Sequence, residues 1–396
     1  MNVDKILTLL KFSSCEIISE NELYDLLNSK KNLVIKVGFD PTTERLHLGH
    51  VILLRKLRLF QDFGYKISFL IGDFTAMIGD PSGRSDTRKQ ISRDIIVKNF
   101  KNYNKQVFKI LNSDMTTIYF NSSWLKNLSV NSFISLMSNV TVSRLIERND
   151  FKSRYLMNKP IYLHEFVYPL LQAYDSVFMN ADIEFGGIDQ KFNFLLARNL
   201  QKKFGYTSQV SIMVPILRGL DGKNKMSKSL NNCINIDDDF YDMFCKVMSI
   251  PDFLVKDYYI FLDLVTLSEY ESLIVNLSNV MMLKLDLAFR IVSLFYDDVF
   301  AEKAKTKFIN IFSKKNVFYD IDVTFFSIAA YNILLSDFLV KFKFILSYSE
   351  FKRLIKYGSI KINSLVVFDR NFILEINTDY CIKLGKKSYF KIFLRF

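Results

Sequence analysis

The sequence predicts an α/β protein with a doubly wound parallel sheet and an inserted region, followed by an α-helical domain and a small α+β module. Short apolar runs alternate with helical patterns as far as residue 217, which is typical of βα repeats. Helical periodicity alone then continues from Asp237 to about Phe312. Short strand patterns joined by basic turns return after about residue 360. These three changes of pattern divide the chain into its predicted parts.

The composition indicates a globular protein with a polyanionic partner. The chain has 396 residues, of which 49% are hydrophobic and 24% charged, enough for two or three domains with cores. Residues 331–396 carry 12 Lys or Arg against 5 Asp or Glu, so most of the net charge of +12 lies at the C-terminus. A solvated basic face is the simpler interpretation of that excess.

Other features of the composition exclude several classes of protein. The 4 Cys are scattered and have no CxxC spacing or neighbouring His, which argues against structural zinc and a disulfide framework, and no metal ligands are predicted. The longest uncharged stretch, Val323–Ser336, is too short to cross a bilayer. The N-terminus does not have the pattern of a signal peptide. We therefore expect a cytoplasmic protein without a membrane-spanning part.

The first half of the chain has a predicted element order that begins with residues 1–33, expected to be helical. A strand over Val34–Phe39 and a helix from His47 to Phe63, which Gly64 ends, form the first βα unit. The further strands are predicted at Lys66–Ile71, Thr116–Phe120, Ile183–Phe185 and Val210–Leu217, and the further helices at 92–112, 129–148, His164–Met179 and Lys191–Phe204. Residues 92–165 interrupt the βα alternation and are rich in apolar positions. They are predicted to be an insertion that forms a subunit interface.

Two of the 3 His of the chain lie at the start of the first predicted helix. The sequence FDPTTERLHLGH (Phe39–His50) is typical of a strand, a tight turn and a helix N-terminus, where phosphate binds readily. His47 and His50 are three residues apart, so on a helix they share a face and can donate to one anion. Gly49 between them has no Cβ, which lets a flat ring approach the backbone. A surface helix with two ordinary histidines is the simpler interpretation.

A polar loop follows the last predicted strand of the sheet. The loop GLDGKNKMSKSLNN contains Lys225-Met226-Ser227-Lys228-Ser229. Alone, this segment is as typical of a solvated basic loop as of a phosphate site. HLGH and KMSKS together resemble the signature of class I aminoacyl-tRNA synthetases.

The segment GDFTAMIGDPSGRSDTR (Gly72–Arg88) follows the second strand, where ligands bind in a doubly wound sheet. Thr75 and Asp80 could meet an ammonium group there, and Arg84 and Arg88 could reach phosphates. From spacing alone, a plain Asp-Pro-Ser-Gly turn is the better interpretation.

Polar side chains form a stripe on the predicted helix His164–Met179. Tyr168, Gln172 and Asp175 lie at i, i+4 and i+7 among apolar residues. Buried polar groups need partners, so this stripe either packs against other polar groups or faces a small ligand. Further on, Gly186-Gly187 precedes a helix that carries Asp189, an arrangement that suits contacts to ribose hydroxyls.

The assembled motifs resemble the bacterial tyrosyl-tRNA synthetase family from end to end. Besides HLGH, KMSKS and the Tyr168/Gln172/Asp175 helix, the segments GDPSG (79–83) and GGIDQ (186–190) match family segments in the same order. The tail from EFKRLIKYGSIKIN to GKKSYFKI is similar to the αL RNA-binding module of a small-subunit ribosomal protein.

The resemblance implies a Rossmann-like catalytic domain over 1–232, a helical domain over 233–320 that binds the anticodon arm, and an RNA-binding module over 331–396. It implies a homodimer that uses ATP, L-tyrosine and tRNA(Tyr), with Mg²⁺ accompanying ATP, no tightly bound cofactor, and no DNA or membrane partner. The tyrosine carboxylate would attack the α-phosphorus of ATP, and the tRNA ribose would then take the tyrosyl group. The protein would supply position and charge rather than a nucleophile.

The resemblance also assigns roles to individual residues. Asp175 would accept a hydrogen bond from the substrate phenol, and Gln190 would lie near its carboxylate. The set expected around the α-ammonium and the rest of the tyrosine consists of Tyr168, Gln172, Asp80, Thr75 and Asp40. The set expected around ATP consists of Thr42, His47, Gly49, His50, Arg84, Arg88, Gly187, Asp189, Lys225, Ser227, Lys228 and Ser229, in which the histidines, arginines and lysines surround the triphosphate.

Three positions depart from the family's pattern. Lys36 stands where the better-known branch has a tyrosine, Ile188 where a small polar residue is usual, and Ala173 where glycine is common. The first departure leaves open whether the substrate hydroxyl has a second partner.

Three other functions are compatible with parts of the sequence. A tryptophan-specific relative would share the fold, but indole offers no hydroxyl to the polar stripe. A non-catalytic RNA-binding protein would not need HLGH and KMSKS. A small-metabolite adenylyltransferase would not need the basic tail.

Overall fold

The computed structural model describes residues 3–13, 16–29, 32–80, 91–277, 279–312, 323–327, 332–363, 365–385 and 388–395. The chain divides into two compact units, Met1–Ala301 and Glu302–Phe396, and each is described by itself. In the described ranges, no helix is both long enough and apolar enough to cross a membrane.

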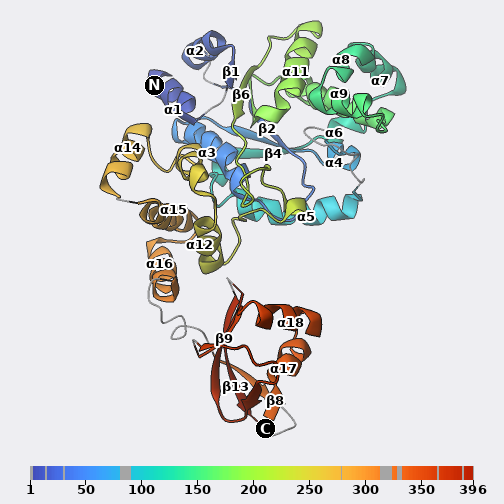
Figure 1. Ribbon diagram of the computed structural model, residues 1–396. Coiled ribbons are helices and arrows are strands. Elements are labelled where there is room, and N and C mark those ends of the chain that lie inside the picture. The colour runs from blue at the N-terminus through green and yellow to red at the C-terminus, as the bar shows by residue number, and fades with distance from the viewer. Residues whose placement is uncertain are drawn as a thin grey trace. The chain divides into compact units, whose positions relative to one another are not determined.

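The first unit is built on a six-stranded sheet with the order β1-β6-β5-β2-β3-β4 (Figure 1). The strands are β1 (Glu16–Ile18), β2 (Ile35–Phe39), β3 (Ile67–Ile71), β4 (Thr116–Phe120), β5 (Ile183–Gly187) and β6 (Val210–Val214). All neighbouring pairs are parallel except β1 and β6, which are antiparallel. The predicted doubly wound α/β sheet is confirmed.

The strand order reverses between β2 and β5. From β2 the chain moves outward through β3 to β4, and it then returns to place β5 and β6 on the other side of β2. The main helices of these repeats are α3 (Leu48–Asp62), α5 (Arg93–Val107), α10 (Leu163–Phe178) and α11 (Lys191–Lys203). Loops that leave two strands in opposite directions open a crevice at their carboxyl ends, and ligands bind there.

Helices cover both faces of this sheet. Phe60 of α3 packs edge-on against Phe185 of β5 on one face, with ring centroids 5.3 Å apart. On the other face, α10 and α11 cover β2 and β5, and the ring of Phe194 lies so close to Gly186 that a Cβ there would be 2.5 Å from it. Gly64 ends α3 with a φ of 91°, a conformation that glycine adopts without strain.

The N-terminal region differs from its predicted helical structure. It forms α1 (Val3–Ser13) and α2 (Glu20–Ser29), but β1 lies between them and pairs with the edge strand β6. A strand of three residues is too short to show an alternating pattern, so its pairing partner rather than its sequence determines it.

Part of the predicted insertion belongs to the sheet. Within residues 92–165, α5 and β4 continue the βα alternation, because β4 pairs in parallel with β3. The short helices after β4 lie outside that alternation, and they are α6 (Ser122–Leu125), α7 (Val130–Met137), α8 (Val142–Ile146) and α9 (Asn149–Leu156). Ser129 and Thr141 cap α7 and α8 by accepting from backbone N–H groups.

Helices follow the sheet from residue 240 onward. They are α12 (Phe240–Met248), α13 (Val255–Phe261), α14 (Leu267–Asn276), α15 (Val280–Phe295) and α16 (Asp298–Phe312). Asp239 caps α12, and Thr266 with Glu269 forms a capping box at α14.

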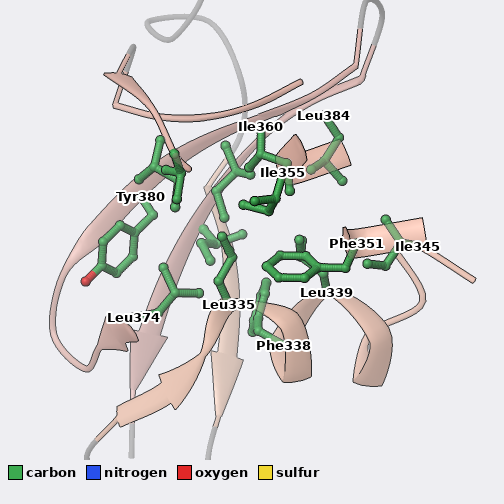
Figure 2. Packing of buried hydrophobic residues seen from close by; sticks show 14 of the residues in the cluster. Leu335, Phe338, Leu339, Ile345, Phe351, Ile355, Ile360, Leu374, Tyr380 and Leu384 are labelled. Carbon is green, nitrogen blue, oxygen red and sulfur yellow. The ribbon is translucent and has the colours of Figure 1, made fainter. Parts of the chain in front are cut away.

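The second unit contains two small sheets. The larger has the order β10-β9-β12-β13-β7 and the smaller pairs β11 with β8. Its elements are β7 (Val323–Ser327), β8 (Asn332–Leu334), α17 (Leu335–Lys341), α18 (Tyr348–Lys356), β9 (Ile360–Ile362), β10 (Leu365–Val366), β11 (Ile373–Glu375), β12 (Asp379–Leu384) and β13 (Ser388–Arg395). Figure 2 shows Leu335, Phe338 and Phe351 from the two helices packing against Ile360 and Leu384 of the larger sheet.

Strand β7 changes the expected start of the last module. The resemblance implies a module over 331–396, yet β7 pairs in parallel with β13. The larger sheet therefore includes a strand that comes before the predicted module.

Candidate active site

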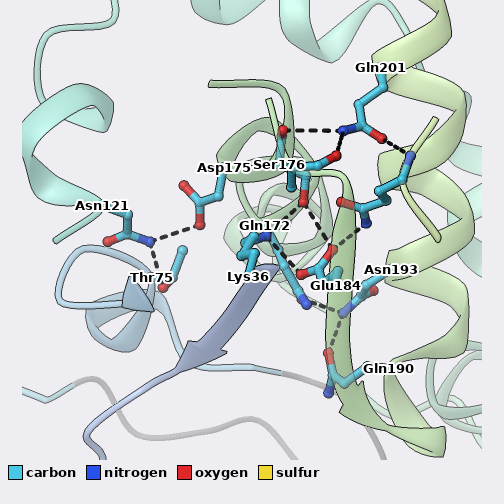
Figure 3. Close-up of polar contacts among 12 residues, drawn as sticks. Lys36, Thr75, Asn121, Gln172, Asp175, Ser176, Glu184, Gln190, Asn193 and Gln201 are labelled. Atoms are coloured by element: carbon cyan, nitrogen blue, oxygen red, sulfur yellow. Dashed lines mark hydrogen bonds and ion pairs between the residues drawn. The ribbon is translucent and has the colours of Figure 1, made fainter. Parts of the chain in front are cut away.

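A pocket of about 360 Å³ lies where the strand order reverses. The carboxyl ends of β2, β3, β5 and β6 supply part of its wall. The N-terminus of α3, helix α10 and the lysine loop after β6 (residues 219–232) are among the other segments that line it. Figure 3 shows deeper polar residues of this region, among them Lys36 and Glu184 of the two central strands, Asp175 of α10 and Asn193 of α11.

The pocket brings together most of the residues that the sequence singled out. Those that line it are Asp40, Thr42, His47, Gly49, His50, Thr75, Asp80, Tyr168, Gln172, Asp175, Gly187, Asp189, Gln190, Lys225, Ser227 and Lys228. Ser229 is not among the lining residues, although its hydroxyl lies 2.8 Å from that of Ser227. Arg84 and Arg88 lie outside the described residues.

His47 and His50 lie side by side at the N-terminus of α3, with ring centroids 3.9 Å apart. Burial lowers the pKa of His50 to about 4, and burial, His50 and Lys225 lower the pKa of His47 well below its usual value. Both rings are therefore neutral at pH 7. The backbone N–H of His47 donates to Nδ1 of His50 at 3.2 Å, so Nε2 of His50 carries the hydrogen. That N–H is a neutral donor for an anion.

Gly49 fits tightly against His47. A Cβ at position 49 would lie 3.1 Å from the imidazole of His47. A side chain at position 49 would therefore require the imidazole of His47 to shift by a few tenths of an ångström.

The lysine loop is fixed at its base and open at its tip. Met226 is buried and its N–H donates to Leu217 O at 3.1 Å. The Asn232 amide accepts from the N–H of Ser227 at 2.8 Å. At the tip, Lys225 Nζ lies 3.2 Å from Asp189 Oδ2, and Lys228 is exposed. Lys225 is thus paired with Asp189, the carboxylate predicted to contact the ribose, whereas Lys228 is exposed to solvent.

The chain that leaves the lysine loop joins the start of α3. Leu48 N donates to Ile234 O at 3.0 Å, and Ile236 N donates to Leu46 O at 3.1 Å. His47 and Asn235 form an antiparallel bridge between these two bonds. The start of α3 is therefore hydrogen-bonded to the segment that follows the lysine loop, although the two are far apart in the sequence.

Asp40 organises the polar groups at one end of the pocket. Tyr168 donates its hydroxyl to Asp40 Oδ2 at 2.9 Å, and Thr75 donates to Oδ1 at 2.8 Å. A Cβ at Gly72 would lie 2.0 Å from the same carboxylate, so only glycine fits beside it. This arrangement leaves a carboxylate at the place where an ammonium group was predicted.

Asp175 is the last residue of the polar stripe, and it is 2% exposed. Trp124 donates its indole N–H to Oδ1 at 2.8 Å, and Asn121 donates to Oδ2 at 3.1 Å. Burial raises the pKa of Asp175 to about 7, although the charge of Lys36 and these two donors oppose the rise. Neither Asn121 nor Trp124 was predicted to lie in the site. The position of Asn121, directly after a strand that ends at the ligand-binding edge, was the available signal.

An amide cluster links the tyrosine-binding candidates. Asn193 donates to Gln172 Oε1 at 2.7 Å and to Gln190 Oε1 at 2.9 Å. Gln190 in turn donates to Asp80 Oδ2 at 2.9 Å, and Arg148 Nη1 donates to Asn193 Oδ1 at 3.1 Å. These bonds fix the orientation of both glutamine amides. Asn193 and Arg148 were not recognised in the sequence because neither lies in a motif.

Comparison with known proteins identifies the class. Residues 28–313 match the family described as tRNA synthetases class I (W and Y). A solved structure of tyrosyl-tRNA synthetase from Archaeoglobus fulgidus, in complex with L-tyrosine, is similar with a TM-score of 0.62 and 25% identity, over 77% of this chain and 100% of that one. A C-terminally truncated mitochondrial enzyme from Aspergillus nidulans has a TM-score of 0.65 at 18% identity, over 78% of this chain and 94% of that one, and shows the fold alone.

Curated sequences narrow the class to one specificity. The tyrosine--tRNA ligase of Aquifex aeolicus (strain VF5) is 44% identical over 392 residues, 99% of each chain. That of Legionella pneumophila (strain Lens) is 44% identical over 95% of this chain and 94% of its own. This chain belongs to the tyrosine--tRNA ligase family.

Proposed function

We propose that the pocket binds L-tyrosine and ATP side by side and that the enzyme joins tyrosine to tRNA(Tyr). Membership of the tyrosine--tRNA ligase family supports the reaction, and the polar stripe of α10 supports its location. The single observation that carries the assignment is that Asp175, at one end of this stripe, and Asp40, which accepts from Tyr168 at the other end, line one pocket with residues of both predicted phosphate-binding segments.

The first step forms a bond between a tyrosine carboxylate oxygen and the α-phosphorus of ATP, and it releases pyrophosphate. The carboxylate is already a nucleophile, so the enzyme contributes position and charge. We assign the phenol to Asp175 and the α-ammonium to Asp40, Asp80 and the amide of Gln172. We place Gln190 near the substrate carboxylate. A ligand without the hydroxyl would leave a buried polar group unpaired, an effect for which enzymes of this family are the standard example.

We assign the phosphates to His47, His50, Lys225 and Lys228, with Arg84 and Arg88 as further candidates from the sequence. We assign the ribose to Asp189. Lys225 forms an ion pair with that carboxylate, and a bound nucleotide would replace this pair. Since both histidines are neutral, they would act as hydrogen-bond donors, and the lysines would supply the positive charge that offsets the leaving pyrophosphate.

Mg²⁺ belongs with ATP as substrate in this proposal. Among the residues that the structure describes, no group of three or more His, Cys, Asp or Glu is arranged to hold a metal ion. The ligands of the ion would then be mainly phosphate oxygens and water, as is usual for magnesium-nucleotide substrates.

The domain roles are part of the same proposal. Residues 1–232 would catalyse both steps, 233–320 would bind the anticodon arm, and 331–396 would bind RNA with the exposed Lys352, Arg353 and Lys356 of α18. A cytoplasmic location follows from the need for tRNA and ATP.

We also propose a homodimer formed through the helices after β4. Val130, Ile134, Leu156, Met157 and Leu163 are exposed apolar residues of α7, α9 and the start of α10, and Leu163 is 82% exposed. Apolar residues gathered on neighbouring helices are typical of a protein interface. Sedimentation of the wild type and of Leu163→Glu would test this assignment, and an unchanged dimer in the variant would contradict it.

Amino-acid-dependent exchange of pyrophosphate into ATP tests the proposed function. The assay contains no tRNA and compares tyrosine, phenylalanine and tryptophan. We expect exchange with tyrosine alone. Exchange with tryptophan would overturn the assignment of Asp175, and no exchange in folded protein that binds tRNA would favour a non-catalytic RNA-binding role.

A further inference from the structure

Two charged side chains lie buried inside the sheet at the point where the strand order reverses. Lys36 of β2 and Glu184 of β5 are direct partners in the parallel register. Lys36 Nζ lies 2.7 Å from Glu184 Oε1, and both residues are at most 1% exposed. Burying two charges costs more than their attraction returns unless further hydrogen bonds satisfy them.

Those further bonds come from Ser176 and Gln209. Ser176 accepts from Lys36 Nζ at 2.7 Å and donates to Glu184 Oε2 at 2.9 Å, and the Gln209 amide donates to the same Oε2 (Figure 3). Both carboxylate oxygens and the serine hydroxyl are thereby satisfied. A lysine ammonium has three N–H donors, and two have acceptors among the described residues. One N–H of a fully buried cation is left over.

Lys36 lies next to the pocket and lines it. Side chains alternate along a strand, so Lys36 shares a face with Gly38, and Glu184 shares it with Gly186. All four residues line the pocket, and both glycines lie toward the carboxyl ends of their strands. A Cβ at Gly38 would meet nothing within 4 Å. Gly38 therefore leaves open space next to the ion pair, whereas the ring of Phe194 fills the space beside Gly186.

Asp175 lies at the same end of the pocket. It directly precedes Ser176, the acceptor for Lys36, on α10. The positive charge of Lys36 also lowers the pKa of Asp175 against the effect of burial, as expected for two groups that face one space. A cation with a spare donor and a carboxylate acceptor thus lie close together at the inner end of the pocket.

We propose that Lys36 donates its third N–H to the phenol oxygen of bound tyrosine, while Asp175 accepts the phenol hydrogen. This inference rests on the proposed function, since it concerns the same substrate. A phenol is both donor and acceptor, so the two residues together recognise the hydroxyl in both directions. A ligand that brings no acceptor would leave a buried ammonium donor unpaired, which is costly. Lys36 is then a specificity residue, and Glu184, Ser176 and Gln209 position it.

A substrate analogue distinguishes the hydrogen bond donated by Lys36 from the hydrogen bond accepted by Asp175. 4-Aminophenylalanine can donate to Asp175, but its aromatic amine is a poor acceptor for Lys36. We expect wild-type enzyme to prefer tyrosine over this analogue in pyrophosphate exchange. Lys36→Met should lower kcat/KM for tyrosine by about 10- to 100-fold, as for loss of a hydrogen bond to a charged group, and should change the value for the analogue by less than about threefold. The preference would then largely disappear.

A second variant removes the concern that Lys36→Met leaves Glu184 unpaired. Lys36→Met/Glu184→Gln replaces both charges with neutral side chains of similar length, so no unpaired charge is buried. Thermal unfolding of each variant establishes that it is folded. We expect the double variant to lose the same preference. A merely structural role for Lys36 would reduce activity with both amino acids equally.

Three results would overturn the proposal. One is a wild-type enzyme that uses 4-aminophenylalanine as well as tyrosine, which needs no variant at all. Another is a folded single or double variant that keeps the wild-type preference, and the third is an equal loss with both amino acids. A wild-type enzyme without tyrosine-dependent exchange would be a different failure, because it would overturn the proposed function itself.

Discussion

Trp124 donates its indole N–H to Asp175 across 2.8 Å, and its ring stacks on Phe178 with centroids 4.5 Å apart. Trp124 is the only tryptophan of the chain. Its fluorescence therefore comes from a single ring in contact with the carboxylate that we assign to the substrate phenol. Titration with tyrosine can be followed through this ring without ATP or tRNA.

Asp175 should make the stability of the protein depend on pH. Its pKa is raised by burial from 3.8 to about 7, so between those values the folded state holds a proton that the unfolded state has lost. The cost of burying the carboxylate is absent below about pH 4, grows toward pH 7 and is complete above it. Asp175→Asn cannot ionise. We expect its thermal midpoint, relative to wild type, to be higher at pH 8 than at pH 5, while tyrosine-dependent exchange falls at least about tenfold.

Asp114→Asn is the matched control for that experiment, because Asp114 is exposed on the first unit. Its midpoint should follow the wild type at both pH values. A difference between Asp175→Asn and wild type that stays constant from pH 5 to pH 8 would show that Asp175 is not the group that titrates.

Gly38→Ala should weaken tyrosine binding without destabilising the fold. The new Cβ meets nothing within 4 Å, because it projects into the space above Lys36 that the substrate ring would fill. Overpacking by one methyl predicts a loss of affinity of about 10- to 100-fold, measured by Trp124 fluorescence, with a thermal midpoint near that of wild type. Gly72→Ala is the contrasting variant, since its Cβ would lie 2.0 Å from Asp40 Oδ1 and should lower stability too. Unchanged tyrosine affinity in Gly38→Ala would show that the substrate ring does not bind at this position.

Lys228→Ala should slow adenylation far more than it weakens ATP binding. Lys228 lines the pocket but is exposed, so its contact with the phosphates would form mainly as the bond to pyrophosphate breaks. We expect single-turnover adenylation to fall about 100-fold or more and the Kd for ATP to change less than about threefold. Lys223→Ala, an exposed lysine of the same loop outside the pocket lining, should behave as wild type. Equal losses in rate and ATP affinity would contradict this view of the loop.

Removal of the last module, including β7, should separate the two steps of the reaction. Because β7 belongs to the sheet of the last module, the chain should be cut after Phe312 rather than at residue 331. We expect tyrosine-dependent exchange close to that of wild type and a large loss of tRNA charging. In the full chain, tRNA affinity should fall steeply with salt, since phosphate contacts release counterions. Normal charging by the shortened protein would exclude the basic tail from tRNA binding.

The sequence was sufficient for the features that repeat or that form motifs. The parallel strands predicted at Lys66–Ile71 and Thr116–Phe120 are present, because a buried strand is a short apolar run with clear limits. The polar stripe of α10 does line a pocket, as one of its two interpretations required. The assignment of residue roles within that pocket remains a prediction.

Other features could not be predicted because they depend on pairing between distant segments. Neither β1 nor β7 shows a pattern of its own, and each exists because an edge strand accepts it. Lys36 and Glu184 lie within short, mostly apolar strand segments, where only the register of β2 with β5 shows that they are partners. Trp124 lies outside every motif and meets Asp175 only in the folded chain.

The backbone bonds between the start of α3 and residues 234–236 have a mechanical consequence for the lysine loop. Before the tip, the loop is held by the hydrogen bond from Met226 N to Leu217 O. After the loop, the chain is held by the hydrogen bond from Leu48 N to Ile234 O. Because both anchors are backbone hydrogen bonds, we expect only the tip of the loop to move when a nucleotide binds. The movement that would bring Lys228 to the phosphates is then confined to that tip and needs no rearrangement of the sheet.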